Sequence, residues 1–167
     1  MKETPIQYRK RILANLQGKE PLAIQSKTPG RLATLVRGLS AAKCRRRPAP
    51  GKWCIAEILA HLADVEIAFG WRLRMILSHN GTPIQAFDQD RWARAGNYLE
   101  QGVGESLADF RALRQKNLRL LRSLPKPKWN NYGLHSERGR ETLRVLAAMM
   151  AGHDLNHLRQ IETLRRR

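Results

Sequence analysis

Apolar residues recur three or four positions apart along nearly the whole chain, which is the spacing of one face of an α-helix. No alternating run of polar and apolar residues lies between hairpin turns, so no β-sheet is expected. The sequence therefore predicts an all-α protein, a four-helix bundle with an extra short N-terminal helix. Because 42% of the 167 residues are hydrophobic, we expect one compact domain over residues 1–167.

Proline, glycine and threonine mark the ends of the expected helices. Thr4-Pro5 and Thr28-Pro29 both look like helix starts, with threonine as the N-cap and proline at the first helical position. The proline-rich stretch 40–52 is expected to be a loop, and the turn at 80–83 ends the longest helix. The expected helices span residues 5–16, 29–39, 53–78, 105–123 and 140–165, with a long connection over 80–103.

The chain is strongly basic, with 31 Lys and Arg against 14 Asp and Glu and a net charge of +17. On the helix expected at 105–123, the arginines at positions 111, 114, 119 and 122 are interpreted as a solvated face. Two arginine triplets, Arg45–Arg47 and Arg165–Arg167, lie in a loop and at the chain end. Such charge favours weak, sequence-independent attraction to nucleic acid rather than specific recognition.

No apolar stretch approaches the roughly 20 residues that a membrane-spanning helix needs. Charged residues follow the N-terminal methionine instead of an apolar signal-peptide core, so we expect a cytoplasmic protein without membrane contact. The two cysteines, Cys44 and Cys54, are expected to be free thiols.

Two histidines interrupt the apolar stripe of the last helix. In the series Met150, His153, His157, Ile161, each residue follows the previous one by three or four positions, so both imidazoles lie on the buried face. Histidines four residues apart on one face suit a single metal ion. His61, on the buried face of the helix at 53–78, is the third candidate ligand. A buried histidine is often only a core residue, and this alternative stays open.

The positions of the histidines along their helices predict the topology of the bundle. His61 lies about eight residues into its helix, and His157 and His153 lie about ten and fourteen residues before the chain end, at ~1.5 Å of rise per residue. These depths match when the two helices are antiparallel. The long connection at 80–103 can return the chain to its starting end, as in bundles with one crossover.

Other polar residues near the histidines have weaker assignments. Asp64 and Gln160 lie one turn from His61 and His157, where each would orient an imidazole or lie at the surface. Glu57 would act as a general base or stabilise the helix start. We identify no catalytic residue and no residue for an organic cofactor.

Several further residues have structural interpretations. His135 is expected to be solvent-exposed in a loop, and His79 to end a helix. Cys54 is not expected to be a nucleophile, because the one histidine near it, His61, is assigned to the metal. The aromatic residues are expected in the core or along a pocket: Trp53, Trp92, Tyr98 and Trp129.

The segments Gly51–Glu66 and Ala151–Ile161 resemble the DinB-like superfamily of metal-binding four-helix bundles, which includes YfiT-type proteins and enzymes that use bacillithiol or mycothiol. The resemblance covers nearly the whole chain. It implies a bundle with one crossover and a divalent ion, zinc, nickel or iron, on His61, His153 and His157. Cys54 departs from the serine or threonine of many relatives, which weakens the expected capping box with Glu57.

Three functions are compatible with this sequence. The first is a metal-dependent enzyme that transfers a low-molecular-weight thiol or catalyses a related metal-assisted hydrolysis of a small molecule. The second is a non-enzymatic, stress-associated metal-binding bundle, and the third is a nonspecific nucleic-acid binder. A homodimer is left open.

Overall fold

The computed structural model describes residues 3–167 and consists mainly of helices, which agrees with the expected all-α class. Seven α-helices and one short 3-10 helix, Lys126–Asn130, are present in this part of the chain. The α-helices are α1 (Pro5–Ala14), α2 (Pro21–Val36), α3 (Ala41–Arg45), α4 (Ile55–Ser78), α5 (Gln89–Ala95), α6 (Val103–Arg122) and α7 (Leu143–Arg166). The three strands are β1 (Thr82–Ile84), β2 (Tyr132–His135) and β3 (Gly139–Thr142).

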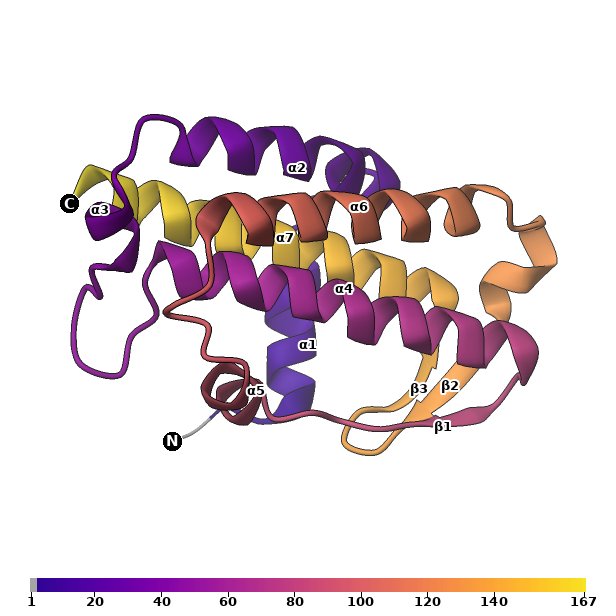
Figure 1. Ribbon diagram of the computed structural model, residues 1–167. Coiled ribbons are helices and arrows are strands. Elements are labelled where there is room, and N and C mark those ends of the chain that lie inside the picture. The colour runs from indigo at the N-terminus through magenta and orange to yellow at the C-terminus, as the bar shows by residue number, and fades with distance from the viewer. Residues whose placement is uncertain (1–2) are drawn as a thin grey trace.

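Four long helices, α2, α4, α6 and α7, lie side by side and form the bundle (Figure 1). The connection between α4 and α6 runs back along the bundle, so α6 points in the same direction as α4, while α7 runs opposite to both. This arrangement confirms the predicted bundle with one crossover. It also makes α4 and α7 antiparallel, as the histidine positions require. Within residues 3–167, no helix has both the length and the hydropathy to cross a bilayer.

A small three-stranded sheet lies along one side of the bundle (Figure 1). The prediction that the chain forms no β-sheet was therefore wrong. β1 pairs with β2 in parallel, and β2 pairs with β3 antiparallel. Each strand has only three or four residues, which is too short to show an alternating pattern. The segment 139–142, expected to begin the last helix, is strand β3, and α7 starts at Leu143 with Thr142 as its N-cap.

Helix α2 begins eight residues before the expected start at Pro29. The Glu20 side chain caps it by accepting a hydrogen bond from the backbone N–H of Ala23 at 2.7 Å. Pro29 lies inside the helix, where it has no N–H for the carbonyl of Gln25. Arg114 Nη1 donates to that carbonyl at 3.1 Å instead. The predicted start was wrong because a contact from another helix satisfies the carbonyl that the proline leaves free.

Two short helices lie in segments expected to be loops. Ser40 caps α3 through the backbone N–H of Lys43, and Asp88 caps α5 through the N–H groups of residues 90 and 91. Both polar side chains are typical N-caps, and each holds a helix of only a few residues. Loops were expected here because of the prolines of 40–52 and the length of 80–103, and the two caps overrule both features locally.

Helix α1 crosses α7 at Gly152, where the two backbones approach closely. Asn15 Nδ2 donates to the Gly152 carbonyl at 3.2 Å, and a Cβ built at Gly152 would lie 2.2 Å from the Ile12 carbonyl oxygen. We expect Gly152→Ala to force the helices apart and to lower the free energy of unfolding by about 1–3 kcal/mol in urea denaturation. Gly104→Ala is the control, because a Cβ there meets no atom within 4 Å. Equal urea midpoints for the two variants would contradict the close approach.

Candidate metal centre

Three buried histidines converge where α4 and α7 face each other. His61 Nε2 lies 3.2 Å from His153 Nε2, and His157 Nε2 lies 3.1 Å from the same atom. The three ring nitrogens that could serve as ligands lie within 4.8 Å of one another, and all three residues are buried. The two helices thus bring together the three histidines that the sequence singled out.

Burial keeps these imidazoles neutral at neutral pH. Removal from water lowers the pKa of His61 and His153 well below the usual value and lowers that of His157 to about 4. A positive charge on His157 would further oppose protonation of His61 and His153, and one on His61 would oppose that of His153. A neutral imidazole keeps one nitrogen lone pair, which is the form that binds metal ions.

Gln160 supports one of the three rings. Its Oε1 lies 3.0 Å from His157 Nδ1. Because an amide oxygen only accepts hydrogen bonds, this contact favours the tautomer with its proton on Nδ1 and leaves the Nε2 lone pair directed at the other two histidines. Gln160 therefore occupies the orienting position expected from the sequence.

The donor set fits a divalent ion such as zinc. Three neutral nitrogens that converge at these distances each offer a lone pair to a central cation. Without a cation, three neutral rings can share only the protons that their own Nε2 atoms carry. His61 Nδ1 and His153 Nδ1 have no hydrogen-bond partner among residues 3–167, so these rings depend on their Nε2 atoms for polar contacts.

Glu57 and Asp64 make contacts other than to the histidines. Glu57 forms an ion pair with Arg47 and accepts a hydrogen bond from the Cys54 backbone N–H at 2.9 Å, so it stabilises the start of α4. Asp64 accepts a hydrogen bond from the Tyr98 hydroxyl at 2.5 Å. Both carboxylates therefore have structural partners.

The other histidines and the aromatic residues differ in their surroundings. His79 caps the end of α4 and is exposed, as expected, whereas His135 is buried in β2, so its predicted exposure was wrong. Alternate residues of β2 face the bundle, so Gly133 and His135 are buried while Leu134 between them is exposed. The Trp53 ring packs against His61 at 4.8 Å between centroids. Tyr98 is buried, and Trp129 packs against the core. Trp92 lines a pocket between α4 and the segment after β1.

A cavity of about 320 Å³ opens beside the histidines and reaches His61 and His153. Apolar side chains form much of its wall, and charged side chains from α4 and from the turn between β2 and β3 complete it. The side chains that line the cavity include Val65, Phe69, Arg72, Met149, Met150, His135 and Arg138. A cavity of this volume accommodates a small organic molecule next to the histidines.

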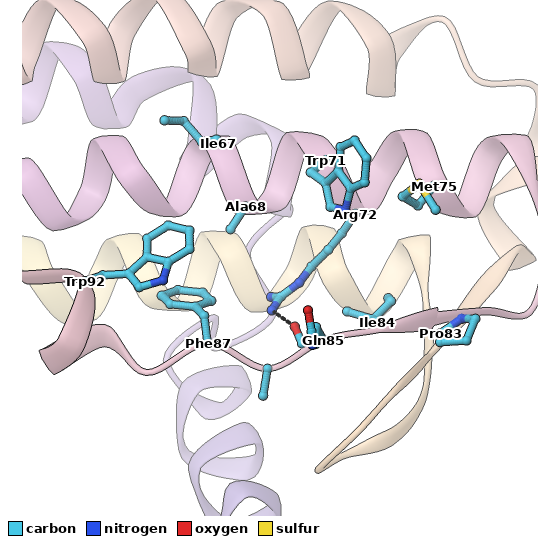
Figure 2. A pocket seen from close by; sticks show the side chains of 11 residues that line it. Ile67, Ala68, Trp71, Arg72, Met75, Pro83, Ile84, Gln85, Phe87 and Trp92 are labelled. Carbon is cyan, nitrogen blue, oxygen red and sulfur yellow. Dashed lines mark hydrogen bonds between the residues drawn. The ribbon is translucent and has the colours of Figure 1, made fainter. Parts of the chain in front are cut away.

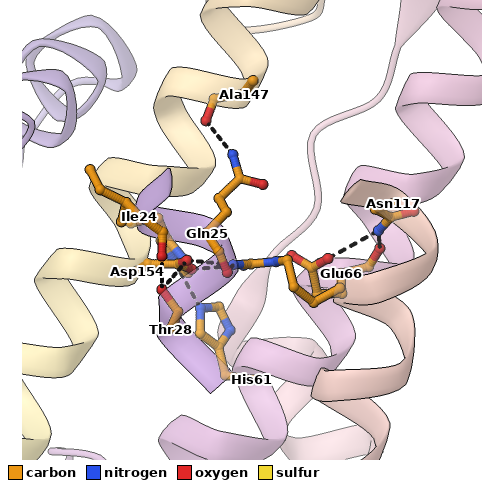
Figure 3. A network of polar contacts seen from close by, with 10 residues as sticks. Ile24, Gln25, Thr28, His61, Glu66, Asn117, Ala147 and Asp154 are labelled. Atoms are coloured by element: carbon orange, nitrogen blue, oxygen red, sulfur yellow. Dashed lines mark hydrogen bonds and ion pairs between the residues drawn. The ribbon is translucent and has the colours of Figure 1, made fainter. Parts of the chain in front are cut away.

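A fully buried ionic network lies one residue from His153. Arg114 Nη2 contacts Asp154 Oδ1 at 2.8 Å and Glu66 Oε1 at 2.9 Å, while Asn117 Nδ2 donates to Glu66 Oε2 at 3.0 Å. Thr28 donates its hydroxyl to Asp154 at 2.8 Å. Figure 3 shows that these side chains meet between the helices next to His61.

The prediction that the arginines of α6 form a solvated face was therefore wrong at one position. Arg114 is fully buried, whereas Arg111, Arg119 and Arg122 are exposed. Arg114 lies four residues after Phe110 and four before Leu118, so it belongs to the buried stripe. Two carboxylates on facing helices compensate its charge, which a periodicity argument based on single residues does not anticipate.

Comparison with known proteins connects this arrangement to a family. A sequence model of the DinB superfamily matches residues 26–161. The chain belongs to the DinB superfamily. A protein of Geobacillus kaustophilus named "Putative metal-dependent hydrolase" is 26% identical over 140 residues, which cover 83% of this chain and 79% of the relative. A protein of the same name from Geobacillus thermodenitrificans is 26% identical over 151 residues, or 89% and 84% of the two chains.

The solved structure of YfiT from Bacillus subtilis has the same fold as this DinB superfamily member. The two align with a TM-score of 0.82 and 20% identity over 87% of this chain and 84% of YfiT. YfiT is described as "a probable metal-dependent hydrolase with an unusual four-helix bundle topology". At this identity the likeness establishes the fold, and the crossover between α4 and α6 agrees with it.

Proposed function

We propose that this protein is a metal-dependent enzyme that binds one divalent ion through His61, His153 and His157 and acts on a small molecule in the adjacent cavity. The observation that carries the proposal is the convergence of three buried, neutral imidazoles beside that cavity. Three protein nitrogens leave further coordination positions for water or substrate, as in catalytic rather than structural zinc sites. Zinc, nickel and iron all accept this donor set.

Hydrolysis is the reaction that we favour, because the relatives in both Geobacillus species are named for it. A bound divalent ion supplies Lewis-acid chemistry and lowers the pKa of a coordinated water or thiol. The chain itself keeps the three rings neutral, favours one His157 tautomer through Gln160 and provides a cavity wall with many apolar side chains. Transfer of a low-molecular-weight thiol is the second candidate, because the same lowering of pKa would activate a thiol.

Metal analysis tests the ligand assignment. We expect the protein purified without chelator and supplied with zinc to hold one equivalent per chain, and chelation to lower its melting temperature. His79→Ala serves as the control for the loss of a histidine outside the cluster, and it should bind zinc as the wild type does. His79 is exposed and lies at the end of α4. A protein that takes up no zinc, nickel or iron and melts at the same temperature with and without chelator contradicts the proposal.

Activity screens then separate the enzyme from a non-enzymatic metal-binding bundle. Esters, amides and thiol acceptors of a size compatible with the cavity are offered to the metal-loaded protein, and products are identified by mass spectrometry. Turnover that disappears in His157→Ala supports the enzyme. A bound ion without water in its coordination shell and without turnover supports the structural alternative.

Nucleic-acid binding ranks last among the three functions. Arg45 and Arg46 donate to the backbone carbonyls of Leu99 and Arg167, and Arg47 pairs with Glu57. Arg165 donates to the carbonyls of Thr34 and Leu35. The guanidinium groups of the first triplet and of Arg165 thus have partners within the fold, which reduces their availability for phosphate contacts.

A further inference from the structure

The wall of the cavity carries a half-buried arginine without a carboxylate partner. Arg72 extends from α4 towards the segment after β1, where its Nη2 donates to the Gln85 carbonyl at 2.7 Å. Figure 2 shows this contact in the neighbouring pocket, which Arg72 also lines. Among residues 3–167 Arg72 forms no ion pair with a carboxylate. Burial, followed by the positive charge of Arg138, lowers the pKa of Arg72, while the negative charge of Glu141 opposes this shift. The Arg72 guanidinium is therefore a half-buried cation with no carboxylate in contact with it.

The other charged groups of the cavity do not supply a counter-charge. Arg138 makes two hydrogen bonds, of 2.7 and 3.0 Å, to the buried carboxylate of Glu141, so this pair is already neutral. Glu3 is paired with Arg11 through contacts of 2.8 and 2.9 Å. Glu137 lies at the exposed rim, where water screens its charge. One uncompensated positive charge thus remains on the wall.

His135 adds an unsatisfied hydrogen-bond donor to the same wall. Its Nδ1 accepts a hydrogen bond from the Glu137 backbone N–H at 3.2 Å, so in the neutral ring the proton is on Nε2. Burial, followed by the charge of Arg138, lowers the pKa of His135 to about 4, which keeps the ring neutral. The Nε2 atom is buried and has no hydrogen-bond partner among residues 3–167. A buried N–H without an acceptor is costly, and an acceptor on a ligand would remove that cost.

We propose that Arg72 and the Nε2–H of His135 form a subsite for a carboxylate group of the substrate. The inference rests on the proposed function in one respect, that the cavity beside the histidine cluster is the substrate site. A carboxylate matches the single uncompensated charge, whereas a phosphate monoester brings a charge of about −1.5 to −2. Arginine binds planar carboxylates through parallel N–H groups, and a neutral N–H alongside adds a further donor.

The apolar residues of the cavity complete the specificity. Val65, Phe69, Met149 and Met150 line it together with the histidines His61 and His153 and with Arg72 and His135. The substrate class is therefore a small acid with an apolar chain, whose carboxylate is held on the wall while its reacting group lies at the histidines. Methionine side chains adapt to chains of different shape.

Binding of simple probes tests the subsite without an assay of turnover. Hexanoate, its uncharged analogue hexanamide and pentyl phosphate are titrated by calorimetry into the metal-free and the zinc-loaded protein. We expect hexanoate to bind at least tenfold more tightly than hexanamide in both forms, and more tightly than pentyl phosphate. Binding to the metal-free form separates the subsite from direct coordination of the carboxylate to zinc.

Matched variants assign the effect to the two side chains. Arg72→Met is expected to abolish the preference for hexanoate, and Arg72→Lys to retain part of it. His135→Leu should weaken hexanoate binding several-fold, while His135→Gln, which keeps an N–H donor, should restore most of it. Arg94→Met is the control, because Arg94 is an exposed arginine of α5 that does not line the cavity. Circular dichroism verifies that each variant is folded.

The outcomes distinguish this inference from the proposed function, since zinc binding is measured on every variant. Normal zinc binding with equal affinities for hexanoate and hexanamide, or with hexanoate affinity unchanged by Arg72→Met, overturns the subsite and leaves the metal centre standing. Tighter binding of pentyl phosphate overturns the carboxylate assignment. A preference for hexanoate that depends on Arg72 in a protein that binds no metal supports the subsite and contradicts the metal-dependent function.

Discussion

Replacing Arg114 with methionine is expected to lower the free energy of unfolding by about 3–5 kcal/mol, measured by urea denaturation of the metal-free protein. The substitution leaves the carboxylates of Glu66 and Asp154 buried without their cation. Burial opposes the charge on Arg114, but the two carboxylates raise its pKa, so the wild-type network contains a cation at every physiological pH. The Arg114→Met substitution also leaves the Gln25 carbonyl of α2 without its hydrogen-bond donor.

Two further variants sharpen this prediction. Arg119→Met removes the same charge from an exposed position of α6 and is expected to change stability by less than about 0.5 kcal/mol. Adding Glu66→Gln to Arg114→Met removes one of the two uncompensated charges and should recover part of the loss. If Arg114→Met and Arg119→Met unfold at the same urea concentration, the buried network does not stabilise the fold.

Replacing His153 with leucine is expected to weaken zinc binding by more than about 100-fold, the upper range seen when a supporting residue of a metal site is lost. His153 is the central member of the cluster, because its Nε2 lies 3.2 and 3.1 Å from the other two. Competition with a chromophoric zinc chelator measures the change. Gln160→Leu should give a smaller loss, because it removes only the contact to His157 Nδ1.

The metal-free forms provide a second comparison. His153→Leu removes a buried Nδ1 that has no partner among residues 3–167, but it also leaves His61 Nε2 and His157 Nε2 without their contact to His153, so it should lower the free energy of unfolding of the metal-free protein by about 1–3 kcal/mol. Zinc at 100 times the wild-type dissociation constant should stabilise the wild type by about 2.7 kcal/mol and the variant by less than about 0.4 kcal/mol. Equal zinc affinity of wild type and His153→Leu would remove this residue from the metal site.

The sequence was sufficient to predict the main architecture because its strongest pattern is long and local. The apolar stripes of α4, α6 and α7 extend over five or more helical turns, and the positions of His61 and His157 along their helices define the antiparallel pairing. The crossover followed from the length of the connection between α4 and α6. These features depend on spacing, which is visible in a single chain.

The features that the sequence did not predict depend on partners distant in the chain. The interior position of Pro29 is tolerated because Arg114, 85 residues later, supplies a donor to α2. The burial of His135 depends on the packing of one face of β2 against the bundle, where Gly133 meets Ile76 of α4, far earlier in the chain. Three charged residues from three helices, Arg114, Glu66 and Asp154, form the centre of the ionic network, and charged side chains are rarely fully buried unless they are paired. Periodicity assigns a face to a residue but does not identify the group that compensates a buried charge.

One guanidinium makes hydrogen bonds to three helices other than its own. Arg114 extends from α6 to the Gln25 carbonyl in α2, to Glu66 in α4 and to Asp154 in α7. Apolar helix faces alone tolerate a slide of one turn, about 5.4 Å, with similar burial. A slide of that size would separate Arg114 from its partner on the displaced helix and leave charges unmatched in the interior. The network thus selects a single longitudinal alignment of the four helices, and in that alignment the imidazoles of α4 and α7 are at the same level.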